Sequence, residues 1–248
     1  MAQWPLGYDR VILDEVDSTS AHAARLAPTT PTWILAHAQT AARGRRGRAW
    51  VNPAGNFAAS LVWRPGGTQA DLALRSFVAS LALQDALTAL GVVGLSLKWP
   101  NDVLLQDRKV AGILLESPAP GLLILGIGVN LVAAPGVAEV EAGAVPPVDI
   151  CTATGRALAA EGLLDALAAA FATREAEFTT WGFAPIRRAW LRHAARLGQR
   201  ITARTMDQTY DGVFETVDAD GQLVLQTADG PRHITAGDVF FDVGTPCS

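Results

Sequence analysis

The sequence predicts an α+β fold in two domains, and three observations lead to this prediction. Strand-like alternation and helix-like spacing of apolar residues are interspersed over residues 1–197. Only short strand-like segments follow, with Asp220-Gly221 and Asp229-Gly230 supplying tight turns between them. A chain of 248 residues is long enough for one large core and a small appended domain. We therefore expect a large first domain over residues 1–197 and a small β-barrel over residues 198–248.

The first elements in the chain are a strand at residues 11–13 and a helix at residues 21–26. A longer helix is expected at residues 71–90, because apolar residues recur there at helical spacing and Gly91 supplies a stop signal. These helices would cover the strands of the first domain and close its core. The other expected helices cover residues 152–160, 163–178 and 185–197.

Strand-like segments at residues 33–38 and 57–64 lie on either side of a basic segment. Pro100 prevents the next strand from continuing, and Asn101-Asp102 is expected to form a turn. A hairpin around Asp107-Arg108 follows, and residues 135–147 are typical of a surface loop. The remaining expected strands cover residues 95–99, 103–106, 109–116 and 122–130 in the first domain, and 200–205, 212–217, 222–226, 233–235 and 239–242 in the barrel.

The composition indicates an ordinary folded protein. Hydrophobic residues make up 50% of the chain and charged residues 18%, which is enough apolar surface for a substantial core. The formal net charge of −4 argues against a broadly basic nucleic-acid surface. Cys151 and Cys247 lack the spacing of a zinc site or a disulfide framework. Because no apolar segment resembles a signal peptide or a membrane span, we expect a cytoplasmic protein without a membrane partner.

The segment Gln39–Trp50 concentrates positive charge more than any other part of the sequence, and its arginines alternate with Gly44 and Gly47. Arginine presents a rigid fork of donors that fits carboxylate and phosphate, and glycine adopts backbone angles closed to other residues. We interpret the segment as a mobile anion-binding loop. The alternatives are a nucleic-acid or nuclear-localisation patch, a solvated charged loop, and chance clustering. The arginines are Arg43, Arg45, Arg46 and Arg48.

Lys98 ends a predicted strand next to Pro100. Because strand side chains alternate, Lys98 lies on the face opposite Leu97 and Trp99. The proline-stiffened turn would hold this lysine more firmly than a surface lysine, although an edge lysine lying along apolar surface is an equal alternative. Likewise, the hydroxyls that precede the helix at residues 21–26 either cap that helix or bind a polar ligand.

The strand at residues 122–130 carries two glycines and an asparagine on one face, since its period of 2 aligns Gly126, Gly128 and Asn130. Glycines inside a buried strand mark close approach of a ligand or of another backbone. We expect a flat floor that ends in an amide able to bind the edge of an adenine or ureido ring. The alternative is close packing between sheet and helix.

The sequence lacks the common signatures of nucleophilic and metal-dependent catalysis. No GxSxG, HExxH or phosphate-binding GxxxxGK[ST] motif occurs. The histidines are scattered without metal-ligand spacing. Positioning and electrostatics would therefore carry any reaction at this site. The histidines are His22, His37, His193 and His233.

Five motifs in order, within residues 11–131, resemble those of the biotin protein ligases, also called biotin–acetyl-CoA-carboxylase ligases. Each motif alone is modest, but five in sequence are specific, and the small C-terminal barrel also fits. The motifs are Asp17-Ser18-Thr19; Gln39 with Arg43-Gly44-Arg45-Arg46-Gly47-Arg48 and Trp50; Lys98-Trp99-Pro100-Asn101-Asp102; Lys109–Glu116; and Gly126-Ile127-Gly128-Val129-Asn130.

The resemblance implies a catalytic domain like that of class II aminoacyl-tRNA synthetases, with a mixed sheet and flanking helices, plus an SH3-like barrel. It implies that biotin and Mg-ATP form biotinyl-5′-AMP and pyrophosphate. The biotinyl group then passes to a lysine of a biotin carboxyl carrier protein. ATP is thus the expected co-substrate, Mg²⁺ its expected companion ion, and the ligands of Mg²⁺ are unassigned. A monomer or a homodimer is compatible with the sequence.

The resemblance also implies roles for individual residues, with Lys98 and Arg45 as the catalytic pair. The expected biotin-binding residues are Ser18, Thr19, Ser20, Gln39, Arg43, Gly44, Arg45, Lys98, Gly112, Gly126 and Gly128. The expected ATP- or adenylate-binding residues are Arg43, Arg45, Arg48, Trp50, Lys98, Asn101, Lys109 and Asn130.

Two residues depart from the family pattern: Ser20 stands where Asn is common, and Ala42 where Gly is common. About 16 residues precede Asp17, too few for the DNA-binding module of some members, so we expect the monofunctional type without DNA binding. A lipoate or related acyl-adenylate ligase is the rival enzyme. A non-enzymatic nucleic-acid-binding protein is the rival of another class, although no aromatic residues interleave the arginines.

Overall fold

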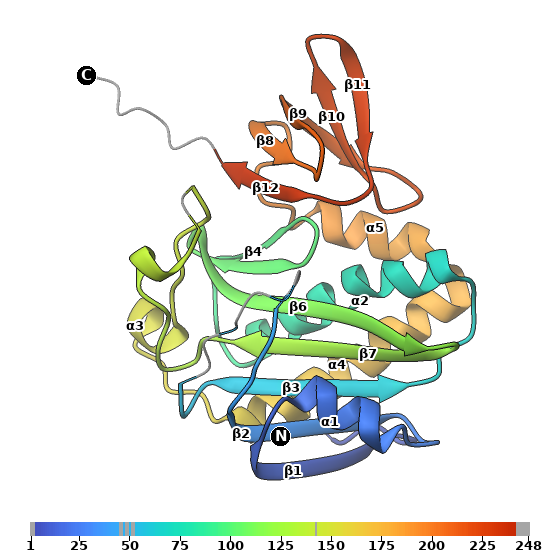
Figure 1. Cartoon of the computed structure of the whole chain (residues 1–248), viewed down its shortest axis with the longest axis vertical. Helices are drawn as coiled ribbons and strands as arrows, with labels where there is room; N and C mark the ends of the chain where they lie inside the picture. The colour runs from blue at the N-terminus through green and yellow to red at the C-terminus, as the bar shows by residue number, and fades with distance from the viewer. Residues whose placement is uncertain (1–2, 45–46, 48–49, 51–52, 142, 242–248) are drawn as a thin grey trace.

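A computed structural model describes residues 3–44, 47, 50, 53–141 and 143–241 (Figure 1). The described chain forms an α+β fold with a seven-stranded mixed sheet and a five-stranded antiparallel sheet. In the large sheet the order is β1-β2-β3-β7-β6-β5-β4, and only β1 and β2 are parallel. Its strands are β1 (Asp9–Val16), β2 (Thr32–Gln39), β3 (Phe57–Trp63), β4 (Leu95–Lys98), β5 (Asp102–Leu105), β6 (Arg108–Ala119) and β7 (Leu122–Val129).

The helices cover the two faces of the large sheet unequally. Figure 1 shows α1 in front of the sheet and the long helices α2 and α4 behind it. The helix-covered rear face holds most of the apolar core, whereas α1 covers only part of the front face. The helices are α1 (Thr19–Leu26), α2 (Gln69–Ala89), α3 (Ile150–Thr154), α4 (Ala160–Trp181) and α5 (Phe183–Leu191), with a short 3-10 helix η2 (Val137–Glu139).

Strand alternation divides the residues of the sheet between these two faces. On β3, Leu61 joins the rear core, whereas its neighbour Val62 packs under α1. On β7, Ile127 and Val129 join the rear core. The intervening positions, Gly126 and Gly128, therefore face the front, as the period of 2 predicts. The front face thus combines a small apolar cluster under α1 with an open area beside it.

The C-terminal sheet has the strand order β11-β10-β9-β8-β12 and lies against the end of the large sheet and helix α5 (Figure 1). Arg187 of α5 donates from Nε to the Val217 carbonyl and from Nη2 to Thr216 Oγ1, the latter over 3.0 Å. These bonds tie the C-terminal sheet to the helical layer. Its strands are β8 (Arg200–Arg204), β9 (Thr209–Val217), β10 (Leu223–Thr227), β11 (Gly230–Ile234) and β12 (Asp238–Phe241).

The predicted strands of both domains are present, but the helix predicted at residues 152–160 is wrong. Asp149 caps α3 through its side chain, which accepts from the Thr152 amide, and Gly155 ends α3 in the left-handed conformation. A new helix, α4, then begins at Ala160 and runs without a break into the segment predicted as the helix at residues 163–178. Helix α5 ends at Leu191, earlier than the predicted residue 197.

Two predicted turns are displaced by one residue. Asp102 opens β5 and is not part of the preceding turn, and Arg108 opens β6. The hairpin turn falls at Gln106 and Asp107, whose φ angles are +51° and +60°.

No helix among the described residues is long and apolar enough to cross a membrane.

Candidate active site

A cavity of about 550 Å³ opens on the front face of the large sheet, beside α1. This volume lies within the range of cavities that bind small molecules. Its floor is formed by β6 and β7, and its walls come from the start of α1, the basic loop, the turn before β5, the loop at residues 135–147 and β12. The expected site residues that line it are Ser18, Thr19, Ser20, Gln39, Arg43, Gly44, Trp50, Lys98, Asn101, Lys109, Gly112, Gly126, Gly128 and Asn130.

One end of the cavity is a network of hydroxyls at the start of α1. Ser18 caps α1, which is one of the two roles expected for the hydroxyls at this helix start. Gln39 Oε1 accepts from the Thr19 amide over 2.8 Å and lies 3.2 Å from Thr19 Oγ1. Ser60 of β3 donates to Thr19 Oγ1 over 2.8 Å and lies 3.0 Å from Ser20 Oγ. These buried groups form a fixed set of donors and acceptors for a polar ligand group.

The floor of the cavity is flat because its central positions are glycines. A Cβ atom on Gly128 would lie 2.5 Å from the Trp50 ring, and one on Gly112 would lie 3.1 Å from it. A Cβ atom on Gly126 would lie 2.8 Å from Ser20 Oγ. Larger side chains at these positions would displace the Trp50 indole or the hydroxyl network. The close neighbours of these glycines are side chains, not the ligand or backbone expected from the glycine spacing, and the contact of Gly126 with Ser20 of α1 is the sheet-to-helix packing named as the alternative.

The opposite end of the cavity carries two lysines that share one carboxylate. Lys98 is 8% exposed, and its Nζ lies 3.5 Å from Asp102 Oδ2. Lys109 Nζ lies 2.7 Å from Asp102 Oδ1. Burial lowers the pKa of Lys98, and the nearby Lys109 charge acts in the same direction, while Asp102 opposes the shift. An incoming anion would stabilise the charged form of Lys98.

Two asparagines border the floor in different ways. Asn101 donates from Nδ2 to the Ile113 carbonyl, which holds the turn before β5 against β6. Asn130 is 2% exposed and donates from Nδ2 to the Val148 carbonyl over 3.1 Å. Its Oδ1 atom is buried without a hydrogen-bond partner among the described residues. Asn130 therefore offers an acceptor to a ligand donor.

The basic loop is closed at its base by a hydrogen bond from the Trp50 amide to the Ala42 carbonyl, over 3.1 Å. Arg43 is exposed and, together with Gly44, lines the cavity. Lys109 Nζ lies 5.7 Å from the centre of the Trp50 ring, so the lysine and the loop meet over the floor. The expected site residues Arg45 and Arg48, and the neighbouring Arg46, lie outside the described residues.

Four features of the site were not predicted from the sequence. Ser60 is fully buried on an otherwise apolar strand, which is a signal that could have identified it. Asp102 was recognised in the sequence only as part of a motif. The sequence did not indicate that its carboxylate lies between two lysines. The loop at residues 135–147 and the segment Asp238–Phe240 reach the cavity from distant parts of the chain. Their positions depend on the packing of the two sheets, which no local pattern in the sequence indicates.

The sequence is similar to those of known proteins. The biotin/lipoate A/B protein ligase family matches residues 15–130, and the biotin protein ligase C terminal domain matches residues 197–242. A biotin–[acetyl-CoA-carboxylase] ligase from Paracoccus denitrificans is 52% identical over 238 residues, covering 93% of this chain and 99% of that protein. The bifunctional ligase/repressor BirA from Bacillus subtilis is 29% identical over 242 residues, covering 94% of this chain and 74% of that protein.

The fold is also similar to that of solved structures. The biotin protein ligase from Aquifex aeolicus in complex with biotin and ATP has a TM-score of 0.82 and 25% identity, covering 93% of this chain and 97% of that one. These likenesses identify the class of protein, an enzyme of the ligase type with an α+β fold. Within that class, the chain belongs to the biotin protein ligase family.

Proposed function

We propose that this chain activates biotin with ATP and transfers the biotinyl group to a lysine of a biotin carboxyl carrier protein. One observation carries the proposal: a single cavity joins a buried hydroxyl network, a glycine floor and a pair of lysines. Biotin has a polar ureido ring at one end and a carboxylate at the other. Its polarity matches this arrangement, with the ureido ring at the hydroxyls and the carboxylate toward Lys98.

In the first half-reaction, a carboxylate oxygen of biotin attacks the α-phosphorus of ATP. The bond from that phosphorus to the bridging oxygen breaks, so biotinyl-5′-AMP and pyrophosphate form. Two anions must approach each other, and cations fixed around them stabilise the transition state most. Lys98 contacts the reacting carboxyl and phosphate oxygens in this proposal, while Arg43 and Arg45 close over them. Each charge-assisted contact is worth about 1.5–3 kcal/mol.

In the second half-reaction, the amine of the acceptor lysine attacks the biotinyl carbonyl carbon. The bond to the AMP oxygen breaks, AMP leaves, and the amine loses a proton as the amide forms. The basic loop must open to admit the acceptor lysine. The carrier is the biotin carboxyl carrier protein of acetyl-CoA carboxylase.

The ligand contacts in this proposal follow the two ends of the cavity. Ser18, Thr19, Ser20 and Gln39 hold the biotin head group, and Gly112, Gly126 and Gly128 form the floor beneath biotin once the Trp50 ring, which lies against Gly112 and Gly128, has moved away. The adenine ring stacks on Trp50, and its amino group donates to Asn130 Oδ1, the acceptor that has no donor among the described residues. Arg48, Asn101 and Lys109 complete the nucleotide side of the site.

Among the described residues, no group of three or more His, Cys, Asp and Glu side chains could hold a metal ion. In our proposal Mg²⁺ is bound by the phosphates of ATP and enters with them, where it would neutralise phosphate charge.

Several properties complete the proposal. Residues 1–197 form a catalytic domain like that of class II aminoacyl-tRNA synthetases, and residues 198–248 form an SH3-like barrel. The protein acts in the cytoplasm as a monomer or homodimer, without binding DNA or membranes. The antiparallel order of the five C-terminal strands supports the barrel assignment.

ATP–pyrophosphate exchange with biotin or lipoate tests the first half-reaction. We expect exchange with biotin and little with lipoate, because the dithiolane ring of lipoate has no strong hydrogen-bonding groups for the hydroxyl network. Exchange with lipoate alone would favour the rival enzyme. Absence of biotin-dependent exchange would contradict the proposal.

A further inference from the structure

The strand that carries Lys98 is held on its outer side by backbone hydrogen bonds. Lys98 ends β4, a strand at the edge of the large sheet. On its outer side, β4 is held by two backbone bonds of 2.8 Å, from Leu97 to the His193 carbonyl and from Ala195 to the Leu97 carbonyl. The segment after α5 therefore fixes one side of this strand.

The residue after Lys98 is anchored by the C-terminal sheet. Trp99 is 3% exposed, and its Nε1 donates to the Gly221 carbonyl over 3.1 Å. Gly221 lies in the turn Asp218–Gln222, which joins β9 and β10. A side chain one position from the lysine is thus bonded to an element more than 120 positions away in the sequence.

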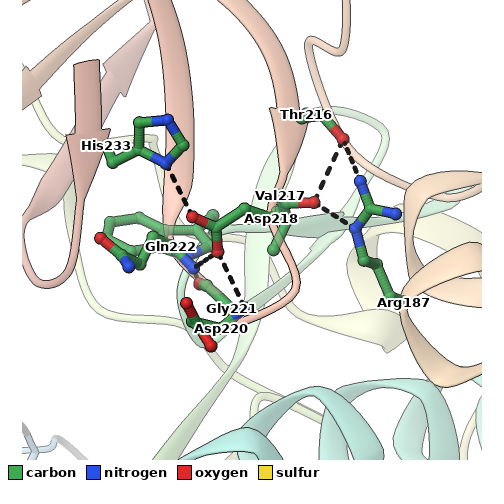
Figure 2. Close-up of polar contacts among 9 residues, drawn as sticks. Arg187, Thr216, Val217, Asp218, Asp220, Gly221, Gln222 and His233 are labelled. Atoms are coloured by element: carbon green, nitrogen blue, oxygen red, sulfur yellow. Dashed lines mark hydrogen bonds and ion pairs between the residues drawn. The ribbon is translucent and has the colours of Figure 1, made fainter. Parts of the chain in front are cut away.

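Polar contacts of the Asp218 side chain hold the turn together (Figure 2). The Asp218 carboxylate accepts from the amides of Asp220 and Gln222 over 3.0 and 2.9 Å, and its second oxygen lies 2.7 Å from His233 Nδ1. Arg187 of α5 holds the strand end just before the turn, at Val217. The Gly221 carbonyl is therefore a fixed acceptor for Trp99.

The turn also fits closely against α2. Gly221 has a φ angle of +80°, and a Cβ atom there would lie 2.8 Å from Leu74 Cδ2 and 3.0 Å from Phe77 Cε2. Only glycine combines this backbone conformation with this approach. Any displacement of the turn relative to α2 would be passed to Trp99 through the Gly221 carbonyl.

We propose that the turn Asp218–Gln222 positions Lys98 for adenylation through the hydrogen bond between Gly221 and Trp99. This inference rests on the proposed function. Trp99 and Gly221 are positioning residues, since neither lines the cavity. Adenylation depends steeply on geometry, because a misplacement of about 1 Å costs about 100-fold in rate. The C-terminal sheet thereby contributes to the chemistry of the first domain.

Trp99→Phe tests this proposal in the full chain, because it removes the N–H donor and keeps an aromatic ring. We expect kcat of biotin-dependent ATP–pyrophosphate exchange to fall about tenfold, with KM for biotin unchanged. Trp63→Phe is the matched control, since Trp63 is buried and its Nε1 has no hydrogen-bond partner among the described residues. Both variants should lower the melting temperature by about 2–4 °C, but only Trp99→Phe should lower kcat.

A second pair of variants tests the turn from the opposite side. Gly221→Ala crowds the turn against the Leu74 and Phe77 side chains of α2 and strains its backbone at φ +80°, so it should also lower kcat with KM for biotin unchanged. Gly230→Ala is its control, because Gly230 has a φ angle of +105° and a Cβ atom there would meet nothing within 4 Å. It imposes a similar backbone strain without moving a contact, so kcat should stay at the wild-type value.

The outcomes separate this inference from the proposed function. If the wild-type protein catalyses biotin-dependent exchange and Trp99→Phe has the same kcat, the inference alone is overturned. Equal losses of kcat in Trp99→Phe and Trp63→Phe would also overturn it, since the link would then contribute only stability. A wild-type protein without biotin-dependent exchange would overturn the proposed function, and the positioning role would fall with it.

Discussion

The two faces of the large sheet use the same strands for different purposes. On the rear face, alternate residues are large and apolar, as at Leu61 of β3 and Ile127 of β7. On the front face, the next residues along are Ser60 and Gly128, which leave room for Trp50 and a hydroxyl network. One face of the sheet therefore supplies much of the free energy of folding, whereas the other gives up apolar burial to make a cavity.

Phe171→Ala should produce the largest effect, and it should appear in stability. Phe171 of α4 is fully buried and packs edge-on against Trp33 and Trp63, with ring centres 5.8 and 5.6 Å apart. Deleting a buried ring costs about 3–5 kcal/mol of unfolding free energy. Denaturant titration measures this cost, and exchange per folded molecule should be unchanged at low temperature. If Phe171→Ala lost exchange activity but kept its full unfolding free energy, the assignment of stability to the rear face and catalysis to the front face would be contradicted.

Lys98→Met should have the opposite profile. The variant keeps the volume of the side chain and removes its charge, so exchange should fall at least about 100-fold, the typical effect of one lost transition-state donor. Stability should change little, because burial already disfavours the charged lysine and Asp102 keeps its contact with Lys109. Exchange kinetics and thermal unfolding measure the two effects. A loss of stability that accounts for the lost exchange would mean that Lys98 has only a structural role.

Ser60→Ala should produce the smallest of the three effects and would sharpen the comparison within the front face. It removes one hydroxyl from the network with Thr19 and Ser20. We expect KM for biotin to rise about fivefold, equivalent to about 1 kcal/mol for a lost hydrogen bond, with KM for ATP unchanged. An equal rise in both KM values would contradict the separation of the cavity into a biotin end and a nucleotide end.

Much of the front face could be predicted because it depends on local patterns. The period of 2 aligns Gly126, Gly128 and Asn130, and Pro100 marks the end of the strand that carries Lys98. Residues brought in by tertiary packing leave no such pattern, so Asp238–Phe240 and the loop at residues 135–147 could not be recognised as cavity walls. The helix expected at residues 152–160 is wrong for a local reason, since Gly155 ends α3 in a left-handed conformation.

The two departures from the family pattern fit this structure. Ser20 is short but reaches Ser60, so the hydroxyl network closes without the amide that is common at that position. Ala42 uses its carbonyl to accept from the Trp50 amide, a contact that does not require glycine. The base of the basic loop is therefore defined by a backbone bond that either residue could form.

A crystal structure with biotinyl-5′-AMP bound would directly test the assignment of the two ends of the cavity. We predict that the ureido ring lies within hydrogen-bond distance of the Ser18–Ser20 segment, and that the acyl phosphate lies beside Lys98. The adenine amino group should donate to Asn130 Oδ1. A ligand bound outside the glycine floor, or bound with its ureido ring at the lysine end, would contradict this binding mode.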